Sequence, residues 1–375
     1  VSLATLALAI TVLVRFDPNG DRYQLTESHA WIKEFGVRYE LGVDGIAVAL
    51  IALTALLIPF IILAGWHDAD PLETGSRRWR PTQGFFALIL AVEAMVILSF
   101  EATDVFLFYI FFEAMLIPMY FLIGGFGDRA HEHGEEAAST QRSYAAVKFL
   151  LSNLVGGLIR LAAVIVPAVC GGTFSLQDIA AARANGSLHM ATNTERWLFL
   201  GFFFAFAVKA PLWPLHTWLP NAMQESTAPV AVLITAVVDK VGTFAMLRFC
   251  LQLFPEASKW ATPVILVLAL ISIIYGALLA VGQRDIKRLV AYASISHFGF
   301  IILGIFAMTS QGQAGSTLYM VNHGISTAAL FLIAGFLVSR RGTRLIADFV
   351  GVQRVAPVLA GTFLVAGLAT LSRPV

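Results

Sequence analysis

The sequence has few charged residues and few cysteines. Asp, Glu, Lys and Arg make up 13% of the 375 residues, whereas 58% of the residues are hydrophobic; a soluble domain has about a quarter charged residues. The net charge of +1 gives no indication of a nucleic-acid partner. The two cysteines, Cys170 and Cys250, stand apart in or beside apolar runs, so we expect small buried side chains and no disulfide framework. This composition places the chain in the membrane class.

Long apolar runs account for most of the sequence. A helix needs about 20 mostly apolar residues to cross a bilayer. Eleven segments approach or reach that length, namely residues 1–15, 42–64, 85–102, 105–123, 144–169, 197–217, 227–254, 261–281, 290–309, 317–338 and 355–371. They predict an all-α, polytopic membrane helix bundle that forms a single transmembrane domain over residues 1–375. Val1 lies inside the first run and Val375 just after the last, so we interpret the chain as a fragment.

Lys and Arg are unevenly distributed between the two sets of alternate loops. One set contains twelve, including Arg77, Arg142, Lys287 and Arg344, and the other contains seven. Because cytoplasmic loops carry the excess of positive charge, the first set is predicted to face the cytoplasm. The loop 127–141 holds His131, Glu132, His133, Glu135 and Glu136 and resembles a metal-binding tract. No further ligand cluster supports a metal, so we interpret it as a solvated loop and expect none.

Several ionisable residues fall inside the apolar runs, where charge is costly and indicates function. The candidates for catalytic roles are Glu113, Lys209, Lys240, His297 and His323. Mid-span depth leaves the Glu and the two Lys little room to reach water, so we expect them to pair across helices and to load and release protons. A satisfied core histidine is the alternative for His323. Lys148 and Arg248 stand nearer the ends of their runs, where we expect them to extend to the interface.

The run that contains Lys209 is predicted to be a broken helix. Pro211 and Pro214 cannot donate backbone hydrogen bonds to the carbonyls of Ala207 and Ala210. Broken backbone inside a membrane is tolerated where it is buried in protein or lines a wet cavity. Pro374 would mark a second break, five spans later. Paired breaks in inverted repeats are typical of transporters.

Three long segments carry a resemblance to a known family. They read FFEAMLIPMYFLIG (111–124), FAVKAPLWPLHTWLP (206–220) and DIKRLVAYASISH (285–297). With these segments the chain resembles, over essentially its whole length, the antiporter-like M subunits of proton-translocating NADH–quinone oxidoreductase, respiratory complex I. The resemblance implies fourteen helices in two inverted five-helix repeats. Here the first repeat would be residues 85–254, and the second, incomplete, residues 261–375.

The resemblance also implies roles and partners. Glu113 matches the family's essential glutamate, Lys209 its pumping lysine, Lys240 the lysine that bridges the two halves, and His297 and His323 the relay histidines. The chain would couple quinone reduction to proton pumping in a bacterial cell (inner) membrane, as a multi-pass enzyme subunit. Its partners would be the other membrane subunits, the lipid bilayer and protons, with no nucleic acid. No cofactor is expected on this chain, because NADH, FMN, the iron–sulfur clusters and quinone would be bound by other subunits.

Two residues depart from the family pattern. Asp239 stands before Lys240 where many relatives have an apolar residue, and Arg160 lies deep in an apolar helix where Met or Leu is expected. Arg160 either pairs with an acid such as Glu93 or Asp239, or weakens membrane insertion by a few kcal/mol. Two other functions stay open at this point. The chain is alternatively a subunit of a multisubunit cation/proton antiporter, or an assembly scaffold whose buried charges only fix helix packing.

Overall fold

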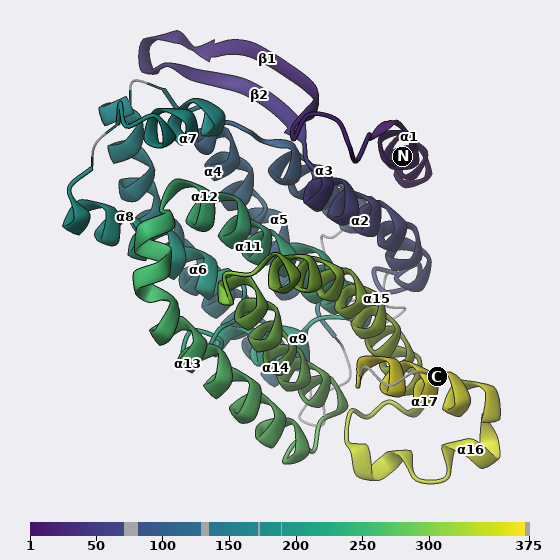
Figure 1. Ribbon diagram of the computed structural model, residues 1–375. Coiled ribbons are helices and arrows are strands. Elements are labelled where there is room, and N and C mark those ends of the chain that lie inside the picture. The colour runs from purple at the N-terminus through teal and green to yellow at the C-terminus, as the bar shows by residue number, and fades with distance from the viewer. Residues whose placement is uncertain (71–81, 129–134, 172, 189, 372–375) are drawn as a thin grey trace.

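Helices make up nearly all of the secondary structure in the computed structural model, which describes residues 1–375 except 71–81, 129–134, 172, 189 and 372–375. Most of the helices run side by side in one bundle, with a β-hairpin across one end (Figure 1). The first half of the bundle contains α1 (Ser2–Arg15), α2 (Gly45–Ala64), α3 (Thr82–Glu101), α4 (Val105–Ala114), α5 (Leu116–Phe126), α6 (Glu135–Gly171) and α7 (Leu176–Ala184). The second half contains α8 (Thr192–Lys209), α9 (Trp218–Glu225), α10 (Ala228–Val232), α11 (Asp239–Ala245), α12 (Leu251–Leu253), α13 (Pro255–Val281), α14 (Ile286–Phe306), α15 (Ser310–Arg341), α16 (Val352–Val355) and α17 (Pro357–Thr370).

Each of the eleven predicted spans is occupied by helix, so the prediction of a polytopic helix bundle is confirmed. Eight spans in the described part of the chain are long and apolar enough to cross a membrane by length and composition. The helices α1 and α17 are apolar but shorter. The remaining span is α8, whose 18 residues include Glu195, Arg196 and Lys209. The chain is therefore an integral membrane protein.

The helix at the centre of the bundle is irregular. The apolar segment of the span between Ala228 and Leu253 is buried inside the protein over its whole length, unlike that of any other candidate span in the described residues. Two π-helical turns, η2 (Leu233–Val238) and η3 (Met246–Cys250), separate α10, α11 and α12 within this span. Such turns widen the backbone hydrogen-bond ring and occur often at functional sites. The sequence analysis predicted one helix here and did not detect these turns.

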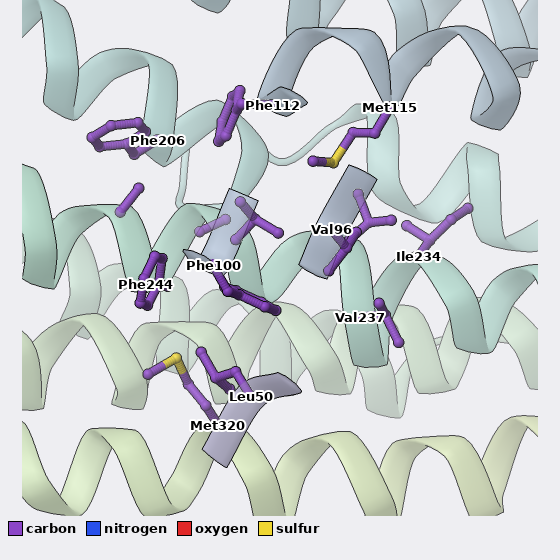
Figure 2. Close-up of a cluster of buried hydrophobic side chains, with 14 of the residues drawn as sticks. Leu50, Val96, Phe100, Phe112, Met115, Phe206, Ile234, Val237, Phe244 and Met320 are labelled. Carbon is purple, nitrogen blue, oxygen red and sulfur yellow. The ribbon is translucent and has the colours of Figure 1, made fainter. Parts of the chain in front are cut away.

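The buried core joins helices that are far apart in the sequence. Figure 2 shows Leu50 of α2, Phe100 of α3, Phe206 of α8, Phe244 of α11 and Met320 of α15 in one apolar cluster. Phe100 and Phe244 meet edge to face with ring centroids 5.0 Å apart. Each of these five side chains is completely buried, so the cluster fixes the central span against its neighbours.

The β-hairpin was not predicted from the sequence. Strands β1 (Gln24–Ile32) and β2 (Val37–Val43) pair antiparallel, with Ser28 opposite Glu40. The strands are connected by a short 3₁₀ turn that ends at Gly36, whose φ of 69° lies in the left-handed region. Most β1 side chains are exposed, and neither strand is a long apolar run, so a search for membrane spans passes over both.

Candidate functional site

The broken helix positions Lys209 at its end. Helix α8 stops at Lys209, and the chain continues through a non-helical segment to α9, as Pro211 and Pro214 predicted. The amide of Ala210 still donates to the carbonyl of Phe206 at 2.7 Å, and the amide of Leu212 to that of Ala207 at 3.1 Å. The indole N–H of Trp218 donates to the carbonyl of Val208 at 2.8 Å. Backbone groups at the break thus form hydrogen bonds within the protein, and Lys209 lies at a helix end inside the bundle.

Lys209 lies in a pocket of aromatic and backbone groups. Its side chain is 1% exposed. The Nζ atom donates to the carbonyl oxygen of Phe112 at 2.8 Å and lies 4.0 Å from the centroid of the Phe112 ring. No ion pair with Glu113 is present among the described residues; the backbone of α4 supplies the hydrogen bond instead. A carbonyl and a ring face both attract an ammonium group.

Glu113 is paired with Arg160. The Nη2 atom of Arg160 lies 3.2 Å from Oε1 of Glu113 and donates to the carbonyl of Tyr109 at 3.3 Å. The Arg160 side chain is fully buried, and that of Glu113 is 13% exposed. The guanidinium carbon lies 3.9 Å from the centroid of the Phe112 ring. Of the two alternatives for Arg160, pairing with an acid is confirmed, but the acid is Glu113 of the facing helix α4 and not Glu93 or Asp239.

Lys240 is held where a π-helical turn meets a regular helix. Its Nζ atom lies 2.6 Å from Nδ1 of His323 in α15 and donates to the carbonyl of Thr235 at 3.2 Å. The ring centroid of Phe298 lies 4.4 Å away. Thr235 belongs to η2, five residues before Lys240, so its carbonyl serves the lysine side chain in the widened turn.

His323 and His297 continue this cluster towards α14. Their ring centroids are 5.3 Å apart. Nδ1 of His297 lies 2.5 Å from the hydroxyl oxygen of Tyr319. His297 and Tyr319 also line a cavity of about 740 Å³ between α13, α14 and α15, together with Ser296 and Ser316. The second cluster therefore extends from the fully buried Lys240 to a half-buried histidine at a cavity.

The predicted residues thus form two clusters rather than one chain of direct contacts. The first is Glu113, Arg160 and Lys209 around the ring of Phe112, and the second is Lys240, His323, His297 and Tyr319. Arg160 and Tyr319 were not selected as site residues from the sequence. The unexpected charge in an apolar helix was the available signal for Arg160, whereas no sequence signal identified Tyr319.

Asp239 lies on the helix that joins the two clusters. It is completely buried, and neither carboxylate oxygen has a hydrogen-bond partner among the described residues. Gly242, three residues later on the same face, allows close packing: a Cβ there would meet the amide nitrogen of Ala210 at 2.8 Å. Asp239 is therefore on the face of α11 that packs against the end of α8, beside Lys209.

Other sequence expectations have mixed outcomes. Arg248 does not extend to the interface, because it is 1% exposed and pairs with Asp44 at 3.0 Å. The histidines of the 127–141 loop, His131 and His133, lie outside the described residues, as does Pro374. No group of three or more His, Cys, Asp or Glu side chains that could hold a metal ion occurs in the described ranges.

Comparison with known proteins places this geometry in a family. Residues 102–375 match the family described as "NADH:quinone oxidoreductase/Mrp antiporter, TM". The chain is 55% identical to NADH-quinone oxidoreductase subunit M of Mycobacterium tuberculosis (strain ATCC 25618 / H37Rv), over all of this chain and 70% of that protein. It is 35% identical to subunit M of Rhodobacter capsulatus, with the same coverage of both chains.

Solved structures agree. A chain of respiratory complex I from Thermus thermophilus matches all of this chain and 73% of its own length, with a TM-score of 0.85 and 33% identity. A chain of the Mrp complex from Dietzia sp. DQ12-45-1b matches all of this chain and 65% of its own length, with a TM-score of 0.80; at 22% identity it shows the fold alone. The antiporter-like fold predicted from the sequence is confirmed, and the chain belongs to the NADH:quinone oxidoreductase/Mrp antiporter family of membrane subunits.

Proposed function

We propose that this chain is a proton-translocating membrane subunit of NADH–quinone oxidoreductase and that Glu113, Lys209, Lys240, His323 and His297 carry the protons. The observation that carries the proposal is that buried titratable groups lie near one another in the bundle, above all Lys240 and His323, which are in contact at 2.6 Å. Ionisable residues inside a membrane are expensive, and in pumps they form proton relays. A proton on Nζ of Lys240 can pass directly to Nδ1 of His323 and then towards His297.

Lys209 and Glu113 supply the other part of the relay. Lys209 is at the end of a broken helix, and its partners among the described residues are a backbone carbonyl and a ring face. A movement of Glu113 towards or away from Lys209 would change how strongly the amine holds a proton. Quinone reduction elsewhere in the complex would drive that movement, and the proton would then continue past Lys240. Asp239 precedes Lys240 in α11, on the face that packs against the end of α8, and is in a position to assist.

The partners and cofactors follow from the same proposal. The other membrane subunits of the complex would be partners of this chain, and NADH, FMN, the iron–sulfur clusters and quinone would be bound elsewhere. We also propose two inverted repeats, residues 85–254 and the incomplete 261–375. In support, the third predicted span of each set contains the longest helix of its set, with 37 residues in α6 and 32 in α15.

The test is proton pumping by the assembled complex with Lys209→Ala or Glu113→Gln. Vesicles with either variant should oxidise NADH but fail to acidify, while native gels show normal assembly. Wild-type acidification by an assembled Lys209→Ala complex would refute the proposal. A complex that fails to assemble, with normal pumping by the fraction that does assemble, would favour the scaffold alternative. No observation in the structure favours the multisubunit antiporter, because the Mrp match shows the fold alone.

A further inference from the structure

Helix α6 presents a shaped and charged site to the carboxylate of Glu113. Gly157 and Arg160 are three residues apart and share one face of the helix. A Cβ on Gly157 would overlap the Glu113 carboxylate, so the absence of a side chain makes a notch that the carboxylate fills. Arg160 then binds Oε1 of that carboxylate from one turn further along. The notch and the cation together are a built seat for Glu113.

The seat is rigid on the arginine side. Four aromatic rings surround the guanidinium, with centroids 3.9 Å (Phe112), 4.9 Å (Tyr109), 5.3 Å (Phe108) and 5.5 Å (Phe206) from its central carbon. Figure 2 shows Phe112 and Phe206 close together, and their centroids are 5.8 Å apart. Cation–π contacts and full burial restrict the Arg160 side chain to few other conformations.

The seat is loose on the glutamate side. The ion pair uses one nitrogen and one oxygen, whereas an arginine and a carboxylate can bind through two parallel hydrogen bonds. Oε2 of Glu113 is buried and has no hydrogen-bond partner among the described residues, and the same is true of Nε and Nη1 of Arg160. The ring of Phe112 has Lys209 4.0 Å from its centroid and Arg160 3.9 Å away. Two cations thus stand in one aromatic pocket with one carboxylate.

We propose that Arg160 is a positioning residue that keeps Glu113 seated in the Gly157 notch and competes with Lys209 for its carboxylate. This inference rests on the proposed function. In the state described here Arg160 holds the carboxylate, and Lys209 relies on the Phe112 carbonyl. Proton translocation requires Glu113 to leave the seat for Lys209 and to return. Without the seat, Glu113 would stay with Lys209 and the exchange would stop.

The experiment compares Arg160→Met with Gly157→Ala in the complete complex reconstituted into vesicles. Arg160→Met removes the cation, whereas Gly157→Ala fills the notch and displaces the carboxylate from Arg160 without changing any charge. Each should lower the protons pumped per NADH oxidised towards the value of Lys209→Ala. Arg160→Lys keeps the charge but not the planar group and should give an intermediate value.

Matched controls separate positioning from a structural role. Arg248→Met removes another buried arginine, which is paired with Asp44 and not with Glu113, and Gly361→Ala adds a methyl group where nothing lies within 4 Å. Both should leave the protons per NADH unchanged in the complex that assembles. Normal pumping by either Arg160→Met or Gly157→Ala would overturn this inference, while loss of pumping in Lys209→Ala would still support the proposed function. Normal pumping by Lys209→Ala would instead overturn the proposed function itself.

Discussion

At the scale of single residues, His323 has two separable tasks. Its Nδ1 atom holds the buried Nζ of Lys240 at 2.6 Å, and its ring is the next titratable group after that lysine. In His323→Asn, the amide oxygen can occupy the place of Nδ1 but cannot carry a proton at neutral pH. We therefore expect this variant to keep the stability of the complex and to lose proton pumping. Vesicle acidification and thermal unfolding of the same preparation measure both properties.

The companion variant His323→Ala removes the partner of Lys240 as well as the relay. It should lower stability by about 2 kcal/mol, since a hydrogen bond to a charged group contributes about 1.5–3 kcal/mol. Pumping by His323→Asn at the wild-type rate would show that His323 is only a satisfied core histidine, which is the alternative that the sequence left open. Equal stability of the two variants would contradict the contact with Lys240.

The burial of the candidate ionisable residues could be predicted from the sequence, whereas their pairing partners could not. Glu113, Lys209 and Lys240 were selected because each lies mid-span, a property of a single helix. The partner of Arg160 depends instead on which faces of α4 and α6 meet, and that follows from packing along the whole length of both helices. The acids proposed for it from the sequence, Glu93 and Asp239, were therefore wrong although burial and pairing were anticipated.

At the scale of elements, Asp104 connects the hairpin to the start of α4. Its carboxylate accepts from the amides of Phe106 and Leu107 at 2.9 Å and from that of Arg38 in β2 at 3.1 Å. Asp104→Ala should destabilise the protein by about 2 kcal/mol, because it removes a helix cap and leaves three amides without this acceptor. Thermal unfolding in detergent measures the loss, with the exposed Asp21→Asn as the control that should change nothing.

The pH dependence of stability gives a second, independent test of Asp104. Burial raises the pKa of this carboxyl, against the opposing effect of the three amide donors. A raised pKa in the folded state means that stability is fully present below the unfolded pKa of about 3.9 and is lost as pH rises through the folded value. Asp104→Asn keeps one acceptor oxygen for the amides of α4 and has no charge, so its stability should not fall as pH rises. The stability of Asp104→Asn relative to wild type should therefore increase from acid to neutral pH; a difference that does not change with pH would contradict the assignment.

The helices were predictable wherever hydropathy alone determines the location of a membrane span. The eleven spans were located because a helix in lipid must satisfy its own backbone groups over a fixed length. The π-helical turns of the central span were not, since they depend on side-chain contacts such as that of Lys240 with the Thr235 carbonyl. The hairpin was also missed, because its stability comes from pairing and from contacts such as Arg38 to Asp104 rather than from an apolar run.

At the scale of the whole molecule, contacts between loops hold one end of the bundle together. At one end, Lys287 in the first turn of α14 contacts Asp128 after α5 and donates to the carbonyl of Ser226 at 2.8 Å. Arg344 after α15 donates to the carbonyl of Gln224 at 2.7 Å. These loops belong to the more basic set of the sequence. The chain therefore gathers its basic loops at one end, which the positive-inside rule places in the cytoplasm.

Cysteine labelling in intact cells tests this orientation. Asn19 and Gln353 are exposed and lie at opposite ends of the bundle, and Val267 is 55% exposed on the outer face of the long helix α13. A membrane-impermeant maleimide should label Asn19→Cys in intact cells and Gln353→Cys only after permeabilisation. Val267→Cys should resist the reagent in both cases, because lipid covers it. Labelling of Gln353→Cys before permeabilisation would show that the bundle has the opposite orientation in the membrane. It would also reverse the direction of the proton transfer that we propose for Lys209 and Lys240.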